Sequence, residues 1–386
     1  MFGIGGKQRA RVVAILDIGS SSVGCAFVSV RHNEPSIILA STRSFLPPAT
    51  RSPDQLISGL SSIVKNIGTT LLASYASKSQ AVHGSPRDLY CIVRSPWTQS
   101  HTVRVVQTFE KPRGIHDALI SDMAKKALSD ASVDRATLLE ASVSQIELNG
   151  YPIRKADGKI AQEVAVAVLI SSIDQAFRQE IDTAVHATFV GLEPKWRSHT
   201  RAALSTLGDL PQGIRDHVLI DVSGENTSLV VVRKNVIDVQ GQAPEGVRKI
   251  LQRVAPGKPE EETLSLIHML ERDACSGTAC DAIRAAMGAA EPEIVHAFGE
   301  VFETLSTTRK LPQYAILLTH TDLADWLTKI LGRIDFAPFT ATGLPFHVTT
   351  LGGTDLGHWV VPDTGIATDA SLSLASALVH IESNES

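Results

Sequence analysis

The chain lacks several features that would place it in a common functional class. It has 4 tryptophans and 4 tyrosines among 386 residues, and its formal net charge is −5. Lysine and arginine form no cluster interleaved with aromatic residues, so the sequence does not favour nucleic acid as a partner. No apolar run approaches the roughly 20 residues that span a bilayer, and the opening MFGIGGKQRAR has no signal-peptide core. We therefore expect a cytoplasmic protein without a transmembrane segment.

Cysteine is also scarce, and its placement does not indicate a metal centre. Cys25 and Cys91 lie in apolar, strand-like runs typical of buried core positions. Cys275 and Cys280, in CSGTAC, have neither the spacing of zinc ligands nor a second pair nearby. We expect core roles for the first two and no metal site at the second two.

What the chain does contain is one motif that occurs twice. VVAILDIGSSSVGCAFVSV occupies residues 12–30, and HVLIDVSGENTSLVVVRKNVI occupies residues 217–237. Each reads as a β-branched strand that ends in Asp, a Gly/Ser turn and a second strand. Asp17 and Asp221 lie about half the chain apart. The repeat predicts one supersecondary unit used in two lobes.

The chemistry of such a hairpin points to phosphate. Backbone N–H groups converge at a Gly/Ser turn without a Cβ in the way, which forms a nest for anionic oxygens. A carboxylate at the end of each first strand can hold the waters of a Mg²⁺ ion. Two facing hairpins therefore predict a clamp for a metal–nucleotide.

The remaining chain predicts alternating strands and helices. SPDQ at Ser52 is a helix start signal, and it precedes a helix to Tyr75. Further expected elements are a strand at 36–45, a small α+β module at 85–169, a helix crossing between lobes at 196–207, helices from 244 to 308 with breaks at Pro256–Pro259, Gly277 and Pro292, a strand at 314–319, helices at 321–331 and 369–380, and a disordered tail at 382–386.

These elements together resemble the actin-like ATPase superfamily. The hairpin DIGSSSV, its duplicate, a crossing helix and a strand–helix near the C-terminus carry the resemblance. Within the superfamily the chain resembles the FtsA/PilM branch of cell-division and type IV pilus proteins, whose first lobe carries an inserted SHS2-type subdomain. The segments YCIVRSPWTQSHTV, ISDMAKKAL and GKIAQEVAVAVLISS lie where that subdomain lies, and the start MFGIGGK is similar to that of many PilM-type proteins.

The resemblance implies an α/β fold, the two-lobed actin-like (ribonuclease H-like) ATPase fold. It implies a first lobe at 1–207 that includes the inserted subdomain, and a second lobe at 208–386 with a helical subdomain at about 244–308. ATP or ADP with Mg²⁺ would be the cofactor, and Asp17 and Asp221 would hold the metal through water. The implied phosphate-binding residues are Gly19, Ser20, Ser21 and Ser22 in the first hairpin and Gly224, Glu225, Asn226 and Thr227 in the second.

Three departures from the family pattern favour a related alternative. Nucleotide-binding relatives carry a Gly-Gly pair after the strand near the C-terminus, whereas AILLTHTDLADWL has His320 and Thr321 there. A Cβ at these positions would crowd a base or ribose. Ser223 replaces a usual glycine, and the pair Gly352–Gly353 comes later than the family position and is typical of a loop turn. The alternative is a pseudo-ATPase adaptor that keeps the clamp without binding nucleotide.

The expected partners are proteins at the inner membrane. The C-terminal sequence SLSLASALVHIESNES is acidic, which disfavours the basic amphipathic membrane helix of division-type members. Recruitment through the cytoplasmic peptide of a membrane protein remains, with a division-ring protein and self-association into filaments or dimers as further possibilities. Trp97 is either an exposed anchor for such a contact or part of the subdomain's own core.

Two enzymatic interpretations also follow. At most a slow ATPase is expected, because Glu193 is the only polar candidate for orienting a water, and a helix-end charge explains that residue better. A small-molecule kinase of the same superfamily would need a general-base Asp at the end of a first-lobe strand, and Asp17 is the only obvious one.

Overall fold

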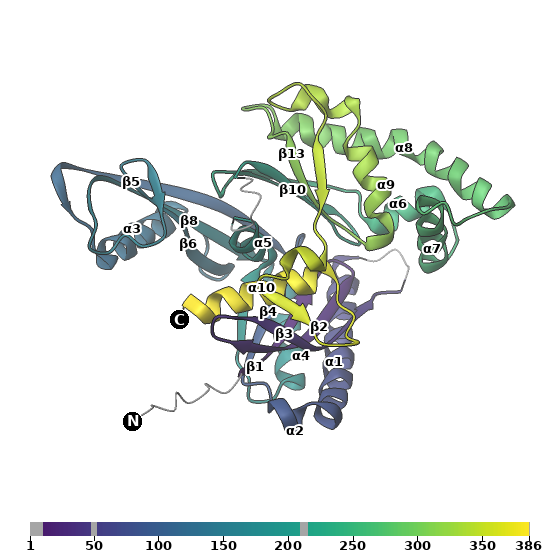
Figure 1. Cartoon of the computed structure of the whole chain (residues 1–386), viewed down its shortest axis with the longest axis horizontal. Coiled ribbons are helices and arrows are strands. Elements are labelled where there is room, and N and C mark those ends of the chain that lie inside the picture. The colour runs from purple at the N-terminus through teal and green to yellow at the C-terminus, as the bar shows by residue number, and fades with distance from the viewer. Residues whose placement is uncertain (1–10, 48–51, 209–214, 386) are drawn as a thin grey trace, which may run out of the picture. The chain divides into compact units, whose positions relative to one another are not determined.

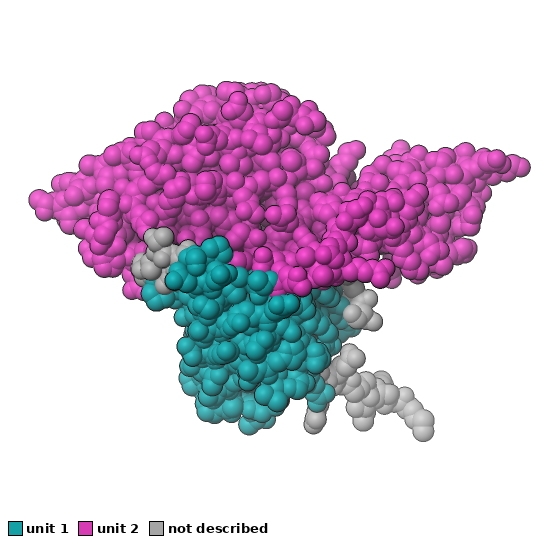
Figure 2. All heavy atoms as spheres, turned by 180° about the vertical axis from the view of Figure 1, so that it is seen from behind, with its two compact units in different colours: residues 1–94, 176–206, 351–386 teal, residues 95–175, 207–350 magenta. Residues whose placement is uncertain are grey.

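The structure is a computed structural model that describes residues 11–47, 52–208 and 215–385. The chain forms two compact units, which Figure 2 colours separately. Unit 1 comprises residues 1–94, 176–206 and 351–386, and unit 2 comprises residues 95–175 and 207–350. Each unit is described by itself below.

Unit 1 is built on a six-stranded sheet (Figure 1). Its order is β15-β3-β2-β1-β4-β9, in which β1, β2 and β3 form an antiparallel meander and β4 and β9 continue in parallel. Apolar, β-branched residues fill both faces of the central strand, as expected for a strand covered by helices on both sides. The strands are β1 (Arg11–Ile18), β2 (Ser22–Arg31), β3 (Glu34–Phe45), β4 (Asp88–Val93), β9 (Pro194–Ser198) and β15 (Val360–Pro362).

Helices cover the sheet of unit 1, and the longest begins as the sequence predicts. Ser52 caps α1 (Pro53–Lys78) in a capping box: its Oγ accepts from Gln55 N at 3.4 Å, and Gln55 Oε1 accepts from Ser52 N at 3.0 Å. The α1 helix packs against β2 and β3. The other helices of this unit are α2 (Gln80–His83), α4 (Gln175–Thr188), α5 (His199–Leu207), the 3₁₀ helix η2 (Gly353–Leu356) and α10 (Ala370–Glu385).

The α1 helix also corrects one prediction. By length and composition alone it could cross a membrane, with a mean hydropathy of 1.3 over 18 residues, of which 44% are buried. The expectation that no segment approaches this limit was therefore wrong. Its buried residues, which include Leu60, Val64 and Leu71, face the sheet of unit 1, as in the core helix of an α/β domain.

Unit 2 repeats the sheet order. Its five strands run β12-β11-β10-β13-β14, again an antiparallel meander followed by two parallel strands. The predicted half-chain duplication is confirmed. The strands are β10 (His217–Val222), β11 (Thr227–Arg233), β12 (Val236–Ala243), β13 (Tyr314–Leu318) and β14 (His347–Thr350); the helices are α6 (Val247–Val254), α7 (Glu260–Glu271), α8 (Thr278–Leu305), α9 (Thr321–Leu331) and the 3₁₀ helix η1 (Ile334–Phe339).

A small α+β subdomain is inserted in the chain between β4 and β9. Its four-stranded antiparallel sheet has the order β5-β8-β6-β7, and a helix packs on one face over an apolar core of its own. The subdomain groups with unit 2, where Ile237 N on β12 donates to Thr102 Oγ1 at 3.1 Å. Its elements are β5 (Thr98–Gly114), α3 (Asp117–Asp130), β6 (Leu138–Leu148), β7 (Tyr151–Ile153) and β8 (Ile160–Ile173).

The predicted domain boundaries need correction at three places. The inserted subdomain begins near Ser95 and not Ser85, because Asp88–Val93 is a strand of the first sheet. The division at 207/208 does not separate the units, since residues 351–386 return to unit 1, where β15 pairs with β3. The segment 196–207 is not one helix but strand β9 followed by α5.

Two local predictions also fail, in both cases because tertiary packing overrides a local signal. Pro292 does not break α8, since Ala290, Ile294 and Phe298 on either side of it are buried in the core of unit 2. The predicted disordered tail is part of α10, which continues to Glu385.

The cysteines divide as two pairs. Cys25 and Cys91 are free and buried, as predicted, and burial raises the pKa of the Cys25 thiol to about 12. Cys275 and Cys280 form a disulfide in the connection between α7 and α8. Within the described residues, no group of three or more His, Cys, Asp and Glu side chains is arranged to hold a metal ion.

The C-terminal end of α10 is attached to unit 1 by one carboxylate. Arg197 donates to Glu382 through Nε at 2.8 Å and Nη2 at 3.1 Å, and Arg201 Nη2 lies 2.8 Å from the same side chain, which is 11% exposed. Burial by itself would raise the pKa of Glu382, but the hydrogen bonds and charges of the two arginines hold it below the usual range. The carboxylate thus stabilises the folded state as an anion.

Glu382→Gln should lower the free energy of unfolding by about 2–3 kcal/mol, because two half-buried guanidinium groups lose a charged acceptor. The folded-state pKa is depressed, so this contribution is present above the ordinary Glu pKa of about 4.3 and is lost as the pH falls through the folded-state value. Denaturant unfolding of both proteins from pH 7 down to pH 3 measures the difference, which should narrow on acidification. Glu34→Gln, at an exposed pair with Arg31, is the matched control; an equal loss there would contradict the assignment.

Candidate functional site

The first predicted hairpin is a closed turn in unit 1. Gly19 N donates to Ser22 O at 2.9 Å, and Leu46 N on the far side of the meander donates to Ser21 O at 2.8 Å. Asp17 and Ser20 are fully buried, and Ser21 and Ser22 nearly so. The structure therefore brings the predicted residues of this hairpin together, but the Gly19 amide already has an acceptor inside the turn.

A row of three residues crosses the sheet at the predicted metal ligand. Asp17 on β1 is paired with Gly24 on β2, and Gly24 is paired with Arg43 on β3. Because Gly24 has no side chain, the guanidinium of Arg43 can extend over it toward Asp17. A Cβ added at Gly24 would lie 2.7 Å from Arg43 Nη2, so the glycine is required for this approach.

Arg43 joins three parts of unit 1. Its Nη2 donates to Asp17 Oδ2 at 2.6 Å and its Nη1 to Ser22 Oγ at 3.2 Å. It also grips Asp369 with two parallel bonds, Nε to Oδ2 at 2.8 Å and Nη2 to Oδ1 at 3.1 Å. Asp369 in turn accepts from Leu372 N at 2.9 Å at the start of α10. One guanidinium thus links the hairpin, β3 and the last helix.

The electrostatics of this group follow from the contacts. Burial alone would lower the pKa of Arg43, but Asp369 and Asp17 raise it above its ordinary value. Burial alone would likewise raise the pKa of Asp369, whereas the charge and hydrogen bonds of Arg43, with a contribution from Arg94, lower it. The carboxylate and the guanidinium are both held in their charged forms.

The second hairpin in unit 2 repeats the turn. Ser223 N donates to Asn226 O at 2.9 Å, the equivalent of the Gly19–Ser22 bond. Asp221 is 4% exposed and is paired with Ser228, which is paired with Gln242 on β12. The register of the first lobe is therefore reproduced, with a neutral glutamine in the row position that Arg43 occupies in the first lobe.

Helix α6 begins directly on the second turn. Val247 N and Arg248 N donate to the carbonyls of Ser223 and Gly224 at 2.9 and 3.0 Å. Gly246 makes this approach possible, since an added Cβ would lie 2.4 Å from Gly224 O. The predicted residues Gly224 and Glu225 are thereby tied to the helix, Glu225 through an ion pair with Arg248.

The other predicted residues of this hairpin also have protein partners. Asn226 Nδ2 donates to Ser95 Oγ at 3.1 Å, and the Thr227 hydroxyl donates to the carbonyl of Glu245. Each hairpin is organised within its own unit. The joint clamp of Asp17 and Asp221 on one Mg²⁺ remains a prediction.

The region that should accept the adenosine carries side chains where glycine was expected. His320 caps α9, with its Nδ1 accepting from Asp322 N at 3.3 Å, and His268 Nδ1 lies 2.9 Å from Asp322 Oδ1. The later pair Gly352–Gly353 opens the short helix η2 in unit 1 and does not follow β13. The structure thus offers no glycine substitute at this position.

Two further residues do not have the functional roles that the sequence suggested, the orientation of a water for Glu193 and a partner contact for Trp97. Glu193 has a 93% exposed side chain near His186, so it belongs to no enclosed site. Trp97 is only 6% exposed, which makes it a core residue and not an exposed anchor.

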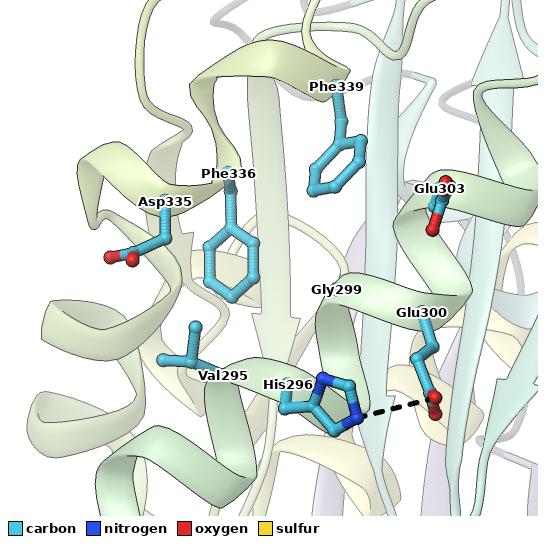
Figure 3. A pocket seen from close by; sticks show the side chains of 8 residues that line it. All are labelled: Val295, His296, Gly299, Glu300, Glu303, Asp335, Phe336 and Phe339. Atoms are coloured by element: carbon cyan, nitrogen blue, oxygen red, sulfur yellow. Dashed lines mark ion pairs between the residues drawn. The ribbon is translucent and has the colours of Figure 1, made fainter.

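A pocket of unit 2 contains none of the predicted residues. Its volume is about 240 Å³, and it lies between α8 and η1, where the rings of Phe336 and Phe339 face Gly299 and the acidic side chains Glu300 and Glu303 (Figure 3). His296 lies 3.4 Å from Glu300. The volume is below the 300–1,000 Å³ typical of ligand pockets, and the carboxylates would repel phosphate. The pocket therefore does not suit a nucleotide.

No direct signal in the sequence marks Arg43 or Asp369. Neither lies in a recognisable motif, and they are 326 positions apart. A glycine inside an apolar strand, at Gly24, is the one local feature that marks a close approach by another group.

Comparison with known proteins supports the architecture. No protein-family model matches the chain, and no curated protein matches it. Among solved structures the chain is similar to a chain of the PilM-PilN type IV pilus biogenesis complex, with 15% identity, 97% of this chain and 99% of that chain covered, and a TM-score of 0.58. The chain has the actin-like ATPase fold. At this identity the likeness concerns the fold and not the activity.

A second solved structure is less similar to the chain. The ethanolamine utilization protein EutJ from Carboxydothermus hydrogenoformans has 13% identity, with 97% of this chain and 91% of that chain covered and a TM-score of 0.49.

The actin-like fold implies a nucleotide with Mg²⁺, and the residues of the first hairpin do not fit it as predicted. Asp17 Oδ2, which would bind a metal-bound water, accepts instead from Arg43 at 2.6 Å. The Gly19 amide is used within the turn, and His320 caps α9 at the position where the family resemblance predicts a glycine. We derive no chemical step through a nucleotide.

Gly246→Ala should lower the free energy of unfolding by about 2–3 kcal/mol, because the new Cβ meets the backbone of the second turn and pushes α6 away. Urea unfolding of the purified protein measures the change. Gly288→Ala is the control: it lies inside α8 with no atom within 4 Å of the added Cβ, so a gain of up to about 1 kcal/mol in helix propensity is expected. Equal stability of Gly246→Ala and the parent would show that α6 is not seated on the turn.

Proposed function

We propose that this protein is an actin-like scaffold that organises a type IV pilus assembly complex at the inner membrane. The observation that carries the proposal is the likeness to a chain of the PilM-PilN complex, which extends over 97% of this chain and 99% of that one. A match of this extent includes both sheets and the inserted subdomain, which we assign to the SHS2 type. The order of elements in the sequence supports the same branch.

Membrane association would occur through a partner. The last helix, α10, places Leu372, Leu374, Leu378 and Val379 in the core of unit 1, so it does not offer an apolar face to lipid. The solved relative is a complex with PilN. By analogy, the cytoplasmic segment of an inner-membrane protein would hold this chain at the membrane as a peripheral protein.

The inserted subdomain is the part best suited to receive such a segment. It has a sheet and a core of its own, and the two larger sheets are complete without it. It exposes large apolar side chains, notably Tyr151 at 75% and Ile160 at 71%. Single exposed apolar residues are common on soluble proteins, so Tyr151 and Ile160 mark the positions to test on this module.

The test uses a synthetic peptide with the cytoplasmic sequence of the single-pass membrane protein encoded beside this gene. Calorimetric titration should give a Kd in the micromolar range, about −8 kcal/mol. Ile160→Ser should weaken binding about tenfold, roughly 1.4 kcal/mol, because an apolar contact is lost. Val82→Ser, equally exposed but on α2 of unit 1, should bind as the parent does.

Sedimentation with lipid-only vesicles completes this test. The protein should stay in the supernatant and should sediment only when the vesicles contain the membrane protein. Sedimentation with lipid alone would refute the proposal. The proposal would also be refuted if the peptide formed no complex and no pilus-assembly gene lay near this gene.

A cell-division role remains the second candidate, with a division-ring protein as the partner and filaments or dimers as the assembled form. The same branch resemblance supports it, but the burial of α10 does not favour the membrane helix of division-type members. The kinase alternative would need Asp17 as a general base, and its ion pair with Arg43 disfavours that role.

A further inference from the structure

The strongest unexplained group in the molecule is the ion cluster at the first hairpin. It contains Asp17, with a fully buried side chain, Arg43 at 13% exposure and Asp369 at 37%. Arg94 lies beside it and donates to Ser371 Oγ at 3.0 Å. All of these residues belong to unit 1.

We infer that Arg43 is a built-in cation that takes the place of a metal ion at Asp17, so that this half of the actin-like clamp is held together without Mg²⁺ or nucleotide. The inference goes beyond the scaffold role and does not depend on the identity of the partner. It also says how a pseudo-ATPase would keep the clamp without nucleotide: the side chain of Arg43 replaces the metal ion.

The backbone around Arg43 leaves room for its side chain to reach Asp17. The row of Asp17, Gly24 and Arg43 runs across three adjacent strands at matching register. The guanidinium occupies the space that any side chain at position 24 would need, since an added Cβ would meet Nη2 at 2.7 Å and Leu372 Cγ at 2.9 Å. The glycine and the arginine therefore function as a pair.

The charges of the cluster also leave no demand for a divalent cation. Two carboxylates, Asp17 and Asp369, face two guanidinium groups, Arg43 and Arg94, so the formal charges balance. A buried carboxylate needs a cation or several hydrogen bonds to compensate for its lost hydration. Arg43 supplies the cation, through one charge-assisted bond of 2.6 Å. A metal ion would have to displace it or lie close to a like charge.

The second lobe provides an internal comparison. Its row has the same register, but the residue across Ser228 from Asp221 is Gln242. The fold therefore does not require a cation at this row position. The arginine is a feature of the first lobe alone, where it also anchors the N-terminal end of α10 through Asp369.

The experiment combines titration of the intact chain with three variants of the cluster and one control variant. Calorimetry and thermal unfolding are measured with MgCl₂ alone, ATP alone and Mg·ATP. We expect no heat and no change in Tm for the parent. Micromolar binding of Mg·ATP that is lost in Asp17→Asn and on chelation of the metal would overturn the inference. The Mg·ATP titration tests Asp17 Oδ1 in particular. This atom has no hydrogen-bond partner within the described residues, so it is the one that could still accept from a metal-bound water.

Arg43→Gln reproduces the residue of the second lobe and leaves Asp17 and Asp369 without their cation. Its Tm should fall by about 5–10 °C, and millimolar MgCl₂ should restore part of the loss. Arg31→Gln removes an exposed partner of Glu34 and should change Tm little. An equal effect of the two variants, or no recovery of Arg43→Gln with MgCl₂, would refute the placement of Arg43 at a metal position.

Gly24→Ala gives a second variant that keeps every charge. The added methyl group should displace the guanidinium from Asp17 and lower the Tm, and this measurement needs no added metal. A Tm equal to that of the parent would contradict the assigned role of the glycine. Because the peptide-binding test above uses a different readout, a failure of the scaffold proposal and a failure of this inference can be told apart.

Discussion

The ion pair between Arg43 and Asp17 is the interaction on which the arrangement of unit 1 depends. It connects the first hairpin to the third strand, and through Asp369 it also connects both to the start of the last helix. Asp369 lies 326 positions from Arg43 in sequence, so no local hydrogen bonding brings the start of α10 to the hairpin. A buried guanidinium can satisfy two carboxylates at once because its donors lie in a plane and point in fixed directions. Glycine at position 24 provides the path.

The two lobes share a register and differ in how the turn is supported. In the first lobe a charged side chain crosses the sheet and reaches the carboxylate. In the second, the backbone amides at the start of α6 bind the turn carbonyls, and Gly246 permits the close contact. Both solutions use groups of the protein where the fold could have used a bound anion and a metal. Duplicated supersecondary units are free to diverge in this way because the sheet, and not the turn, carries most of the buried apolar surface.

This view fits a protein that acts through its shape. Both sheets have complete cores, the inserted subdomain has a separate one, and the C-terminal helix is fastened at both ends, by Arg43 and by the arginines around Glu382. A scaffold needs a stable surface more than it needs a nucleotide-driven change of state. The pocket between α8 and η1, with its phenylalanines and acidic rim, adds a surface of different chemistry on unit 2.

The sequence alone determined the features that depend on neighbouring residues. The repeated strand–Asp–turn–strand motif, the helix start at Ser52 and the apolar strands all follow from periodicity and local hydrogen bonding, and the structure confirms them. The family resemblance added the two-lobed fold and the inserted subdomain. Local signals failed where packing prevailed, as at Pro292 inside α8 and in the tail that became part of α10.

Only the tertiary structure decided which groups meet at the predicted site. Arg43 reaches Asp17 through the register of three strands, and Asp369 arrives from a segment 326 positions away. Sheet register and long-range return of the chain are set by the whole core, because a shift of one residue would move every side chain to the opposite face. A carboxylate after a strand therefore predicts a site for a cation, and the folded chain decides whether that cation is a metal or an arginine.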